Sequence, residues 1–127
     1  MRAAILSPLA MMGLAVATPS MAQDDLPRWA AGCQISAVMY QGRADVADDA
    51  RAQAGEAASF WRSAFERVET DAEKRAALVA SSQAALDSDL TGKDAAGQKT
   101  ILATALSVCT RLRPFAERVE KTAEVKP

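Results

Sequence analysis

Two cysteines that lie far apart in the chain constrain the fold more than any other feature of the sequence. Cys33 and Cys109 are the only cysteines, and 76 positions separate them. In a protein that leaves the cytoplasm, an isolated pair of cysteines predicts one disulfide. Such a bridge would hold the first and last elements of the domain side by side. It would stabilise the fold by about 4 kcal/mol, because it restricts the unfolded chain. The alternative is two unpaired, buried thiols.

The first 22 residues have the pattern of a secretory signal peptide. Arg2 precedes an uncharged run rich in Ala, Leu and Met, which ends in the small residues Ser20-Met21-Ala22. We expect cleavage after Ala22 and a periplasmic or secreted product. A membrane anchor is the alternative, but polar and helix-breaking residues interrupt the run, and a span needs about 20 strongly apolar residues. The sequence before Cys33 also resembles a lipoprotein signal, although charged residues occupy the positions where that signal is apolar.

The rest of the chain has the apolar spacing of amphipathic helices, at three- and four-residue steps. Alternating strand patterns are almost absent. Four helices are expected, over 27–41, 46–69, 70–91 and 94–121. Short connections between them predict an all-α, antiparallel, up-down-up-down bundle. We therefore expect one small domain over 23–121, with a disulfide between its first and last helices and a frayed tail over 122–127.

Local signals mark the ends of these helices. Pro27 suits the first position of the first helix, and Asp45 is the predicted cap of the second. The segment 70–73 is a capping box that begins with Thr70, and Gly92 ends the third helix. A kink or a restarted helix is expected at Pro114. The aromatic residues on the apolar stripes are predicted to fill the core: Trp29, Tyr40, Phe60, Trp61 and Phe65.

Composition excludes several functional classes. The chain has no histidine, which rules out Ser-His and Cys-His nucleophile pairs, His-ligated haem and His-based zinc or di-iron sites. Its 15 basic and 16 acidic residues nearly cancel, so it lacks the basic footprint of a nucleic-acid-binding protein. After the leader, no segment is long and apolar enough to span a bilayer. We expect a protein that is not an enzyme and needs no cofactor.

One segment resembles the first half of a calcium-binding loop. In 87–92 (DSDLTG) the residues Asp87, Asp89 and Thr91 stand at positions 1, 3 and 5, and glycine stands at position 6, as in an EF-hand. The second half departs from the pattern, because Gln98 occupies position 12, where a bidentate carboxylate is needed. A calcium-responsive module over 87–98 is therefore the alternative function. The competing interpretation is a plain helix end and turn.

The first helix carries apolar residues on more than one side. Ile35, Val38 and Met39 fall outside its main stripe, so this helix is either buried between neighbours or offers a docking surface. Binding to another envelope protein through these residues is our leading hypothesis, as a chaperone, an inhibitor or immunity factor, or an assembly subunit. In general plan the chain is similar to the small acid-stress chaperones of the periplasm, which are also short, helical and singly disulfide-bonded. A third hypothesis, a bundle that holds a small apolar ligand, requires an internal cavity.

Overall fold

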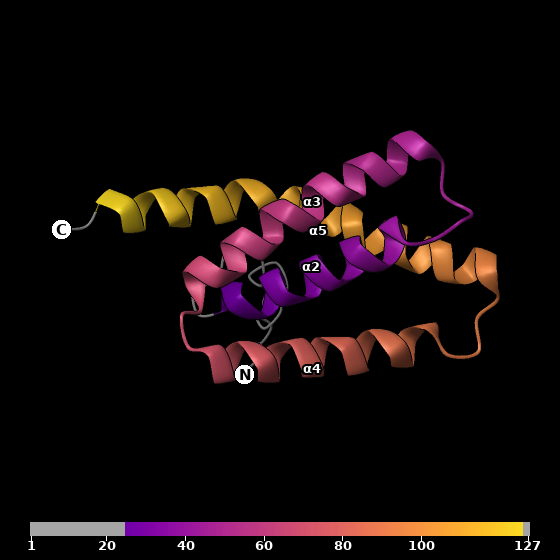
Figure 1. The fold of residues 1–127 in the computed structure, drawn as a ribbon, viewed down its shortest axis with the longest axis horizontal. Helices are drawn as coiled ribbons and strands as arrows, with labels where there is room; N and C mark the ends of the chain where they lie inside the picture. The colour runs from indigo at the N-terminus through magenta and orange to yellow at the C-terminus, as the bar shows by residue number, and fades with distance from the viewer. Residues whose placement is uncertain (1–24, 126–127) are drawn as a thin grey trace, which may run out of the picture.

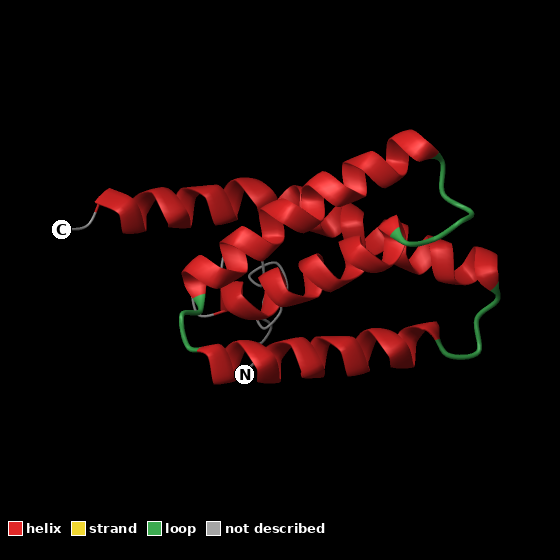
Figure 2. Ribbon diagram, viewed as in Figure 1, coloured by secondary structure: helices red, strands yellow, loops and turns green. Residues whose placement is uncertain are grey.

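The computed structural model describes residues 25–125, so the predicted leader over 1–22 lies outside the described residues. The described chain contains four helices and no strand: α2 (Leu26–Gln41), α3 (Asp48–Val68), α4 (Ala72–Leu90) and α5 (Ala95–Val125) (Figure 2). Successive helices run in opposite directions (Figure 1). The prediction of an all-α, up-down-up-down four-helix fold is confirmed. None of the described helices is long and apolar enough to cross a membrane.

Helix α2 is the centre of the arrangement. It packs against each of the other three helices, most extensively against α3, and in Figure 1 it lies between α3 and α4. A helix surrounded in this way must be apolar on more than one side. Its small residues Ala30, Ala31 and Ala37 are completely buried, so neighbouring helices can approach closely. The apolar residues outside the main stripe of this helix therefore meet other parts of the same chain.

The disulfide lies in the larger of two apolar clusters. Cys33 on α2 and Cys109 on α5 are bonded, with their Cα atoms 5.8 Å apart, and both residues are buried. Trp61 and Phe65 of α3 belong to the same cluster, together with small residues of α2 and α5. The predicted bridge between the first and last of the four helices is therefore confirmed. The bridge joins α2, the central helix, to α5, the last helix of the domain.

The second cluster lies between α2, α4 and α5. It consists of Ile35, Leu86, Leu90 and Leu102, and the half-buried Met39 packs against it. Ile35 is only 8% exposed. Ile35 and Met39 thus do not form an exposed docking face, contrary to the prediction, because α4 and α5 cover that side of α2. Val38 is 52% exposed and is the one member of the predicted face that remains on the surface.

The N-terminus of α4 is capped by a different residue from the one predicted. The Asp71 carboxylate accepts hydrogen bonds from the backbone amides of Glu73 and Lys74, at 2.9 and 3.2 Å. Thr70 therefore lies one residue outside the cap position, and the expectation of a threonine cap is wrong by one residue. Both residue types are good caps. A carboxylate also interacts favourably with the positive end of the helix dipole, which a hydroxyl does only weakly.

Helix α5 continues through its proline. It runs from Ala95 to Val125 with Pro114 inside it, so of the two expected outcomes the restarted helix does not occur, and a kink at Pro114 stays a prediction. A proline removes one backbone hydrogen bond from a helix. Beyond the proline, Phe115, Ala116 and Val119 pack on the larger cluster, and these contacts offset that loss. The helix enters the predicted tail over 122–127, and fraying of that tail stays a prediction.

The turn between α4 and α5 depends on one glycine. Gly92 has a φ of +82°, a conformation that is unfavourable for residues with a Cβ atom. The amide of Lys93 donates to the Leu90 carbonyl at 3.1 Å, which closes the end of α4. Asp94 then caps α5, since its carboxylate accepts from the Gly97 amide at 2.8 Å. The predicted stop at Gly92 is confirmed.

Replacing this glycine tests the turn. We expect Gly92→Ala to lower the free energy of unfolding by roughly 1 kcal/mol, because alanine is strained at positive φ. A Cβ atom at this position meets no neighbour within 4 Å, so the loss comes from backbone strain and not from a clash. Urea unfolding measures the difference, and Gly32→Ala is the control, because an added methyl in that helical position stabilises the fold. Equal stability of Gly92→Ala and the wild type would contradict the conclusion that the turn requires a glycine at this position.

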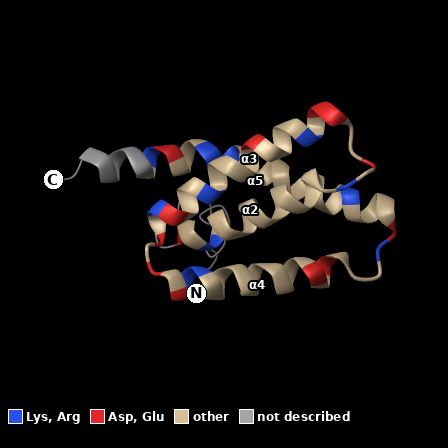
Figure 3. Ribbon diagram, viewed as in Figure 1, with Lys and Arg blue, Asp and Glu red and all other residues tan. Residues whose placement is uncertain are grey.

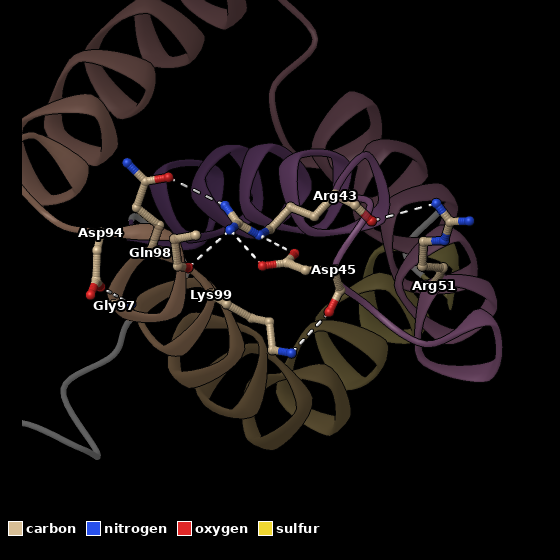
Figure 4. Close-up of polar contacts among 8 residues, drawn as sticks. Arg43, Asp45, Arg51, Asp94, Gly97, Gln98 and Lys99 are labelled. Carbon is tan, nitrogen blue, oxygen red and sulfur yellow. Dashed lines mark hydrogen bonds and ion pairs between the residues drawn. The ribbon is translucent and has the colours of Figure 1, made fainter.

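Polar contacts tie the α2–α3 loop to the start of α5 (Figure 4). The Arg43 guanidinium donates two hydrogen bonds to the Asp45 carboxylate, at 2.8 and 2.9 Å, and a third to the Ala95 carbonyl at 2.9 Å. Lys99 donates to the Asp45 carbonyl at 2.9 Å. The hydrogen bonds from Arg43 hold the pKa of Asp45 below its usual value. Asp45 therefore fastens the loop, and it does not cap α3 as predicted; that helix begins at Asp48 without a side-chain cap.

A second ionic contact joins α3 to α5. Arg113 donates to both carboxylate oxygens of Glu56, at 2.8 Å each. The same guanidinium lies over the Phe60 ring, 4.0 Å from its centroid. The hydrogen bonds from Arg113 lower the pKa of the Glu56 carboxyl. The carboxylate thus stabilises the fold above the pKa it has in the unfolded chain, and this contribution disappears as the pH falls through the folded-state pKa.

Replacing Glu56 by a neutral residue measures how much this contact contributes to the free energy of unfolding. Because the Glu56 side chain is 61% exposed, we expect Glu56→Gln to lower the free energy of unfolding by less than about 1 kcal/mol at neutral pH. The difference from the wild type should vanish in strongly acidic solution, where the wild-type carboxyl is also protonated. Urea unfolding at both pH values measures it. Glu66→Gln serves as the control, since Glu66 is exposed on the same helix and has no ion pair among the described residues. A difference that does not change with pH would contradict the assignment.

Candidate functional site

A groove of about 430 Å³ opens between α2, α4 and α5. Helices α4 and α5 contact each other sparsely, and they separate as they leave the loop that joins them (Figure 1). The volume falls within the range typical of ligand sites, about 300–1,000 Å³. Each of the three helices contributes residues to it: Arg28, Trp29, Gly32, Cys33, Ser36, Ser82, Ala85, Leu86, Asp89, Ala105, Val108 and Cys109. The groove is the candidate binding site of the protein.

Small and apolar groups form the bottom of the groove. Both cysteines of the disulfide line it, and both are buried. A Cβ atom added to Gly32 would meet no atom within 4 Å, so the glycine leaves space open. Leu86 and Ala105 line the groove from α4 and α5. The site is therefore suited to apolar groups, which gain free energy when they leave water.

One buried serine lines the groove, and its hydroxyl has no hydrogen-bond partner among the described residues. Ser36 lines the groove and is only 6% exposed. Its hydroxyl makes no hydrogen bond with any other described residue. The hydroxyl of Thr110, in contrast, donates to the Leu106 carbonyl at 3.0 Å, as helical hydroxyls often do. Buried polar groups nearly always have a hydrogen-bond partner, and an occupant of the groove can supply one to Ser36.

The rim carries an aromatic ring and two opposite charges. Trp29 is 38% exposed and lines the groove, which corrects the prediction that it fills the core. Arg28 and Asp89 are the only charged residues in the lining. Over the helices of the described chain, basic and acidic residues are interspersed (Figure 3). The groove therefore combines an exposed tryptophan with a mainly apolar lining.

The structure does not bring the predicted calcium ligands together. Asp87 and Asp89 lie at the end of α4, and helical residues two apart point to different sides. Asp87 accepts a hydrogen bond from Gln83 at 3.0 Å, and the Thr91 hydroxyl donates to the Asp87 carbonyl at 2.7 Å. Among the side chains that the structure describes, no three acidic or cysteine residues converge on a point where a metal ion could bind. The segment is a helix end and a turn, and Asp89 belongs to the groove.

The groove was not predicted, although the sequence of α2 carries a signal for it. Arg28, Gly32 and Ser36 are spaced four residues apart, so they share one face of α2. On this face the otherwise apolar helix is interrupted by a charged residue, by a glycine, which has no side chain, and by a serine hydroxyl. This pattern is typical of a face that no other part of the chain covers completely. The predicted docking residues Ile35 and Met39 lie instead in the second cluster.

No family model, curated protein or solved structure matches this chain. Its function is therefore inferred from the groove and from the residues that line it. The groove offers an apolar surface, an exposed aromatic ring and an unpaired hydroxyl, which are features of a binding site.

Proposed function

We propose that this chain is an exported, non-enzymatic binding protein of the bacterial envelope. In this proposal it binds a helical segment of another envelope protein in the groove between α2, α4 and α5. The observation that carries the proposal is the apolar groove with Trp29 exposed at its rim. Tryptophan is enriched among the residues that dominate binding energies at protein interfaces.

A helical occupant agrees with the arrangement of the walls. In a regular bundle, consecutive antiparallel helices pack against each other along their length. Here α4 and α5 contact each other sparsely, and the groove lies between them and α2. A helix from another protein that placed its apolar side chains in this gap would extend the bundle. Insertion of an amphipathic helix into an apolar groove is a common mode of recognition.

The chemistry of the chain supports binding and an oxidising compartment. The Cys33–Cys109 disulfide is buried in the main cluster, and such bonds persist mainly in exported proteins. The signal-peptide pattern in the sequence agrees with this location. Because the chain has no histidine, it lacks the side chain that most often serves as a general base.

Filling the groove tests the proposal. We expect Gly32→Leu to remain folded, since a Cβ atom at this position meets no neighbour, and to lose partner binding because the leucine side chain occupies the groove. Gly32→Ala is the matched control: it removes the same helix-destabilising glycine, worth roughly 0.5–1 kcal/mol, but leaves the groove open. Urea unfolding checks that both variants fold.

The partner is identified by photo-cross-linking from inside the groove. A photoreactive residue at Ala85, which lines the groove, is compared with one at Ser63, which is exposed on α3. Mass spectrometry of the cross-linked product names the partner, which is then purified and titrated with the wild type, Gly32→Ala and Gly32→Leu by calorimetry. Binding by the first two and not by the third supports the proposal. Equal binding by all three, or equal cross-linking at both positions, rejects it.

A further inference from the structure

The polar residues of the groove specify the segment that it binds. We infer that this segment is an amphipathic helix with an acidic side chain at the Arg28 end, a basic side chain at the Asp89 end and a small polar side chain opposite Ser36. This inference rests on the proposed function, since it describes the occupant of the same groove. Three observations carry it: the placement of the two charges, the unpaired hydroxyl, and the open volume beside Gly32.

The two charged residues mark opposite ends of the groove. Arg28 lies in the first turn of α2, and Asp89 lies in the last turn of α4. Helices α2 and α4 run in the same direction (Figure 1), so the start of one and the end of the other are far apart along the groove. The N-terminus of α2 adds partial positive charge near Arg28, and the C-terminus of α4 adds partial negative charge near Asp89.

Both charges are available to an occupant. The Arg28 side chain is 71% exposed, and its nearest acidic partner, Asp25, lies 3.8 Å away, at the limit of an ion pair. Asp89 is exposed and has no ion pair within the described part of the chain. Opposite charges on a binding partner favour the correct complex and penalise partners with like charges. A segment with one acidic and one basic end therefore fits this groove better than a segment of uniform charge.

Ser36 determines what lies near the middle of the segment. It follows Arg28 by eight residues on α2, which is about 12 Å at 1.5 Å per helical residue. Its hydroxyl is buried without a hydrogen bond to any described residue, which is unfavourable. A purely apolar occupant would leave it unpaired. A serine or threonine of the partner would supply the missing hydrogen bond. Gly32, one turn earlier, leaves room for an apolar anchor.

Synthetic helical peptides with one common apolar face test the end charges. The mixed peptide has one acidic and one basic end, and two others have both ends acidic or both ends basic. By calorimetry at low salt, we expect the wild-type protein to bind the mixed peptide about fivefold more tightly than either uniform peptide. Arg28→Glu should prefer the doubly basic peptide, and Asp89→Lys should prefer the doubly acidic one. Salt should weaken each preference, because it screens exposed charges.

Two further mixed peptides, with serine or alanine at the central position, test Ser36. We expect Ser36→Ala to stay folded, with a melting temperature equal to or above that of the wild type, since it removes an unpaired buried hydroxyl. Its affinity for the serine peptide should fall about fivefold, which is the loss of one ordinary hydrogen bond. Its affinity for the alanine peptide should not fall. A purely structural role for Ser36 would change both affinities equally.

The peptide experiments distinguish a failure of this inference from a failure of the proposed function. If no peptide binds the wild type or any variant, the groove is not a helix-binding site and the proposed function fails with the inference. If the peptides bind, and Gly32→Leu blocks them, but affinity depends neither on the end charges nor on the central residue, the inference is overturned and the proposed function stands. The expected switch of preference in Arg28→Glu and Asp89→Lys supports both.

Discussion

The double variant Cys33→Ala/Cys109→Ala is expected to lose about 4 kcal/mol of its free energy of unfolding. The bridge closes a loop across 76 positions, so breaking it releases a large conformational entropy in the unfolded chain. A small domain has a total stability of about 5–15 kcal/mol, and a loss of this size leaves the fold marginal. Alanine keeps the site apolar, so the measured loss reports mainly the covalent constraint.

Reductant provides the control for this prediction. Urea unfolding is measured for the wild type and for the double variant, each with and without dithiothreitol. We expect reductant to lower the stability of the wild type to near that of the variant and to leave the variant unchanged. A variant within about 1 kcal/mol of the oxidised wild type, less than the usual 2–4 kcal/mol for a disulfide, would show that packing alone holds α2 against α5.

Truncation of the central tryptophan is the second large effect. Trp61 on α3 is 1% exposed, belongs to the cluster that contains the disulfide and packs edge-to-face against Phe60, with ring centroids 5.1 Å apart. We expect Trp61→Ala to lower the free energy of unfolding by about 3–5 kcal/mol, because it removes buried apolar area and leaves a cavity. Urea unfolding with intact disulfide measures the loss.

The other tryptophan supplies a control of the same residue type. Trp29 is 38% exposed at the rim of the groove, so Trp29→Ala should lower stability by clearly less than Trp61→Ala does. The proposed function adds an opposite expectation for binding, which Trp29→Ala should weaken although the fold survives. Similar losses of stability in the two variants would mean that α3 does not pack as the structure has it.

The number and direction of the helices follow from local patterns that the sequence carries by itself. Apolar residues such as Trp61 and Phe65 recur at helical spacing. Gly92 marks the end of α4 and Asp94 the start of α5, and the structure has both boundaries there. The cap of α4 was misplaced by one residue, because adjacent Thr70 and Asp71 are both good caps. The direction from which the chain enters the helix decides between them, and that direction depends on how α3 and α4 are placed.

The same dependence on how distant helices are placed explains why the candidate site was not predicted from the sequence. The spacing of Ile35 and Met39 shows that they lie outside the main stripe of α2, but whether a foreign protein or another helix covers them depends on residues about 50 positions later, such as Leu86. Periodicity is a property of neighbouring residues and contains no information about distant ones. The sequence alone therefore determined the helices and, through its two cysteines, which helices are joined. Only the packing of α4 and α5 around α2 decided that one face of this central helix lies in the second cluster, while the face with Gly32 and Ser36 lines the groove.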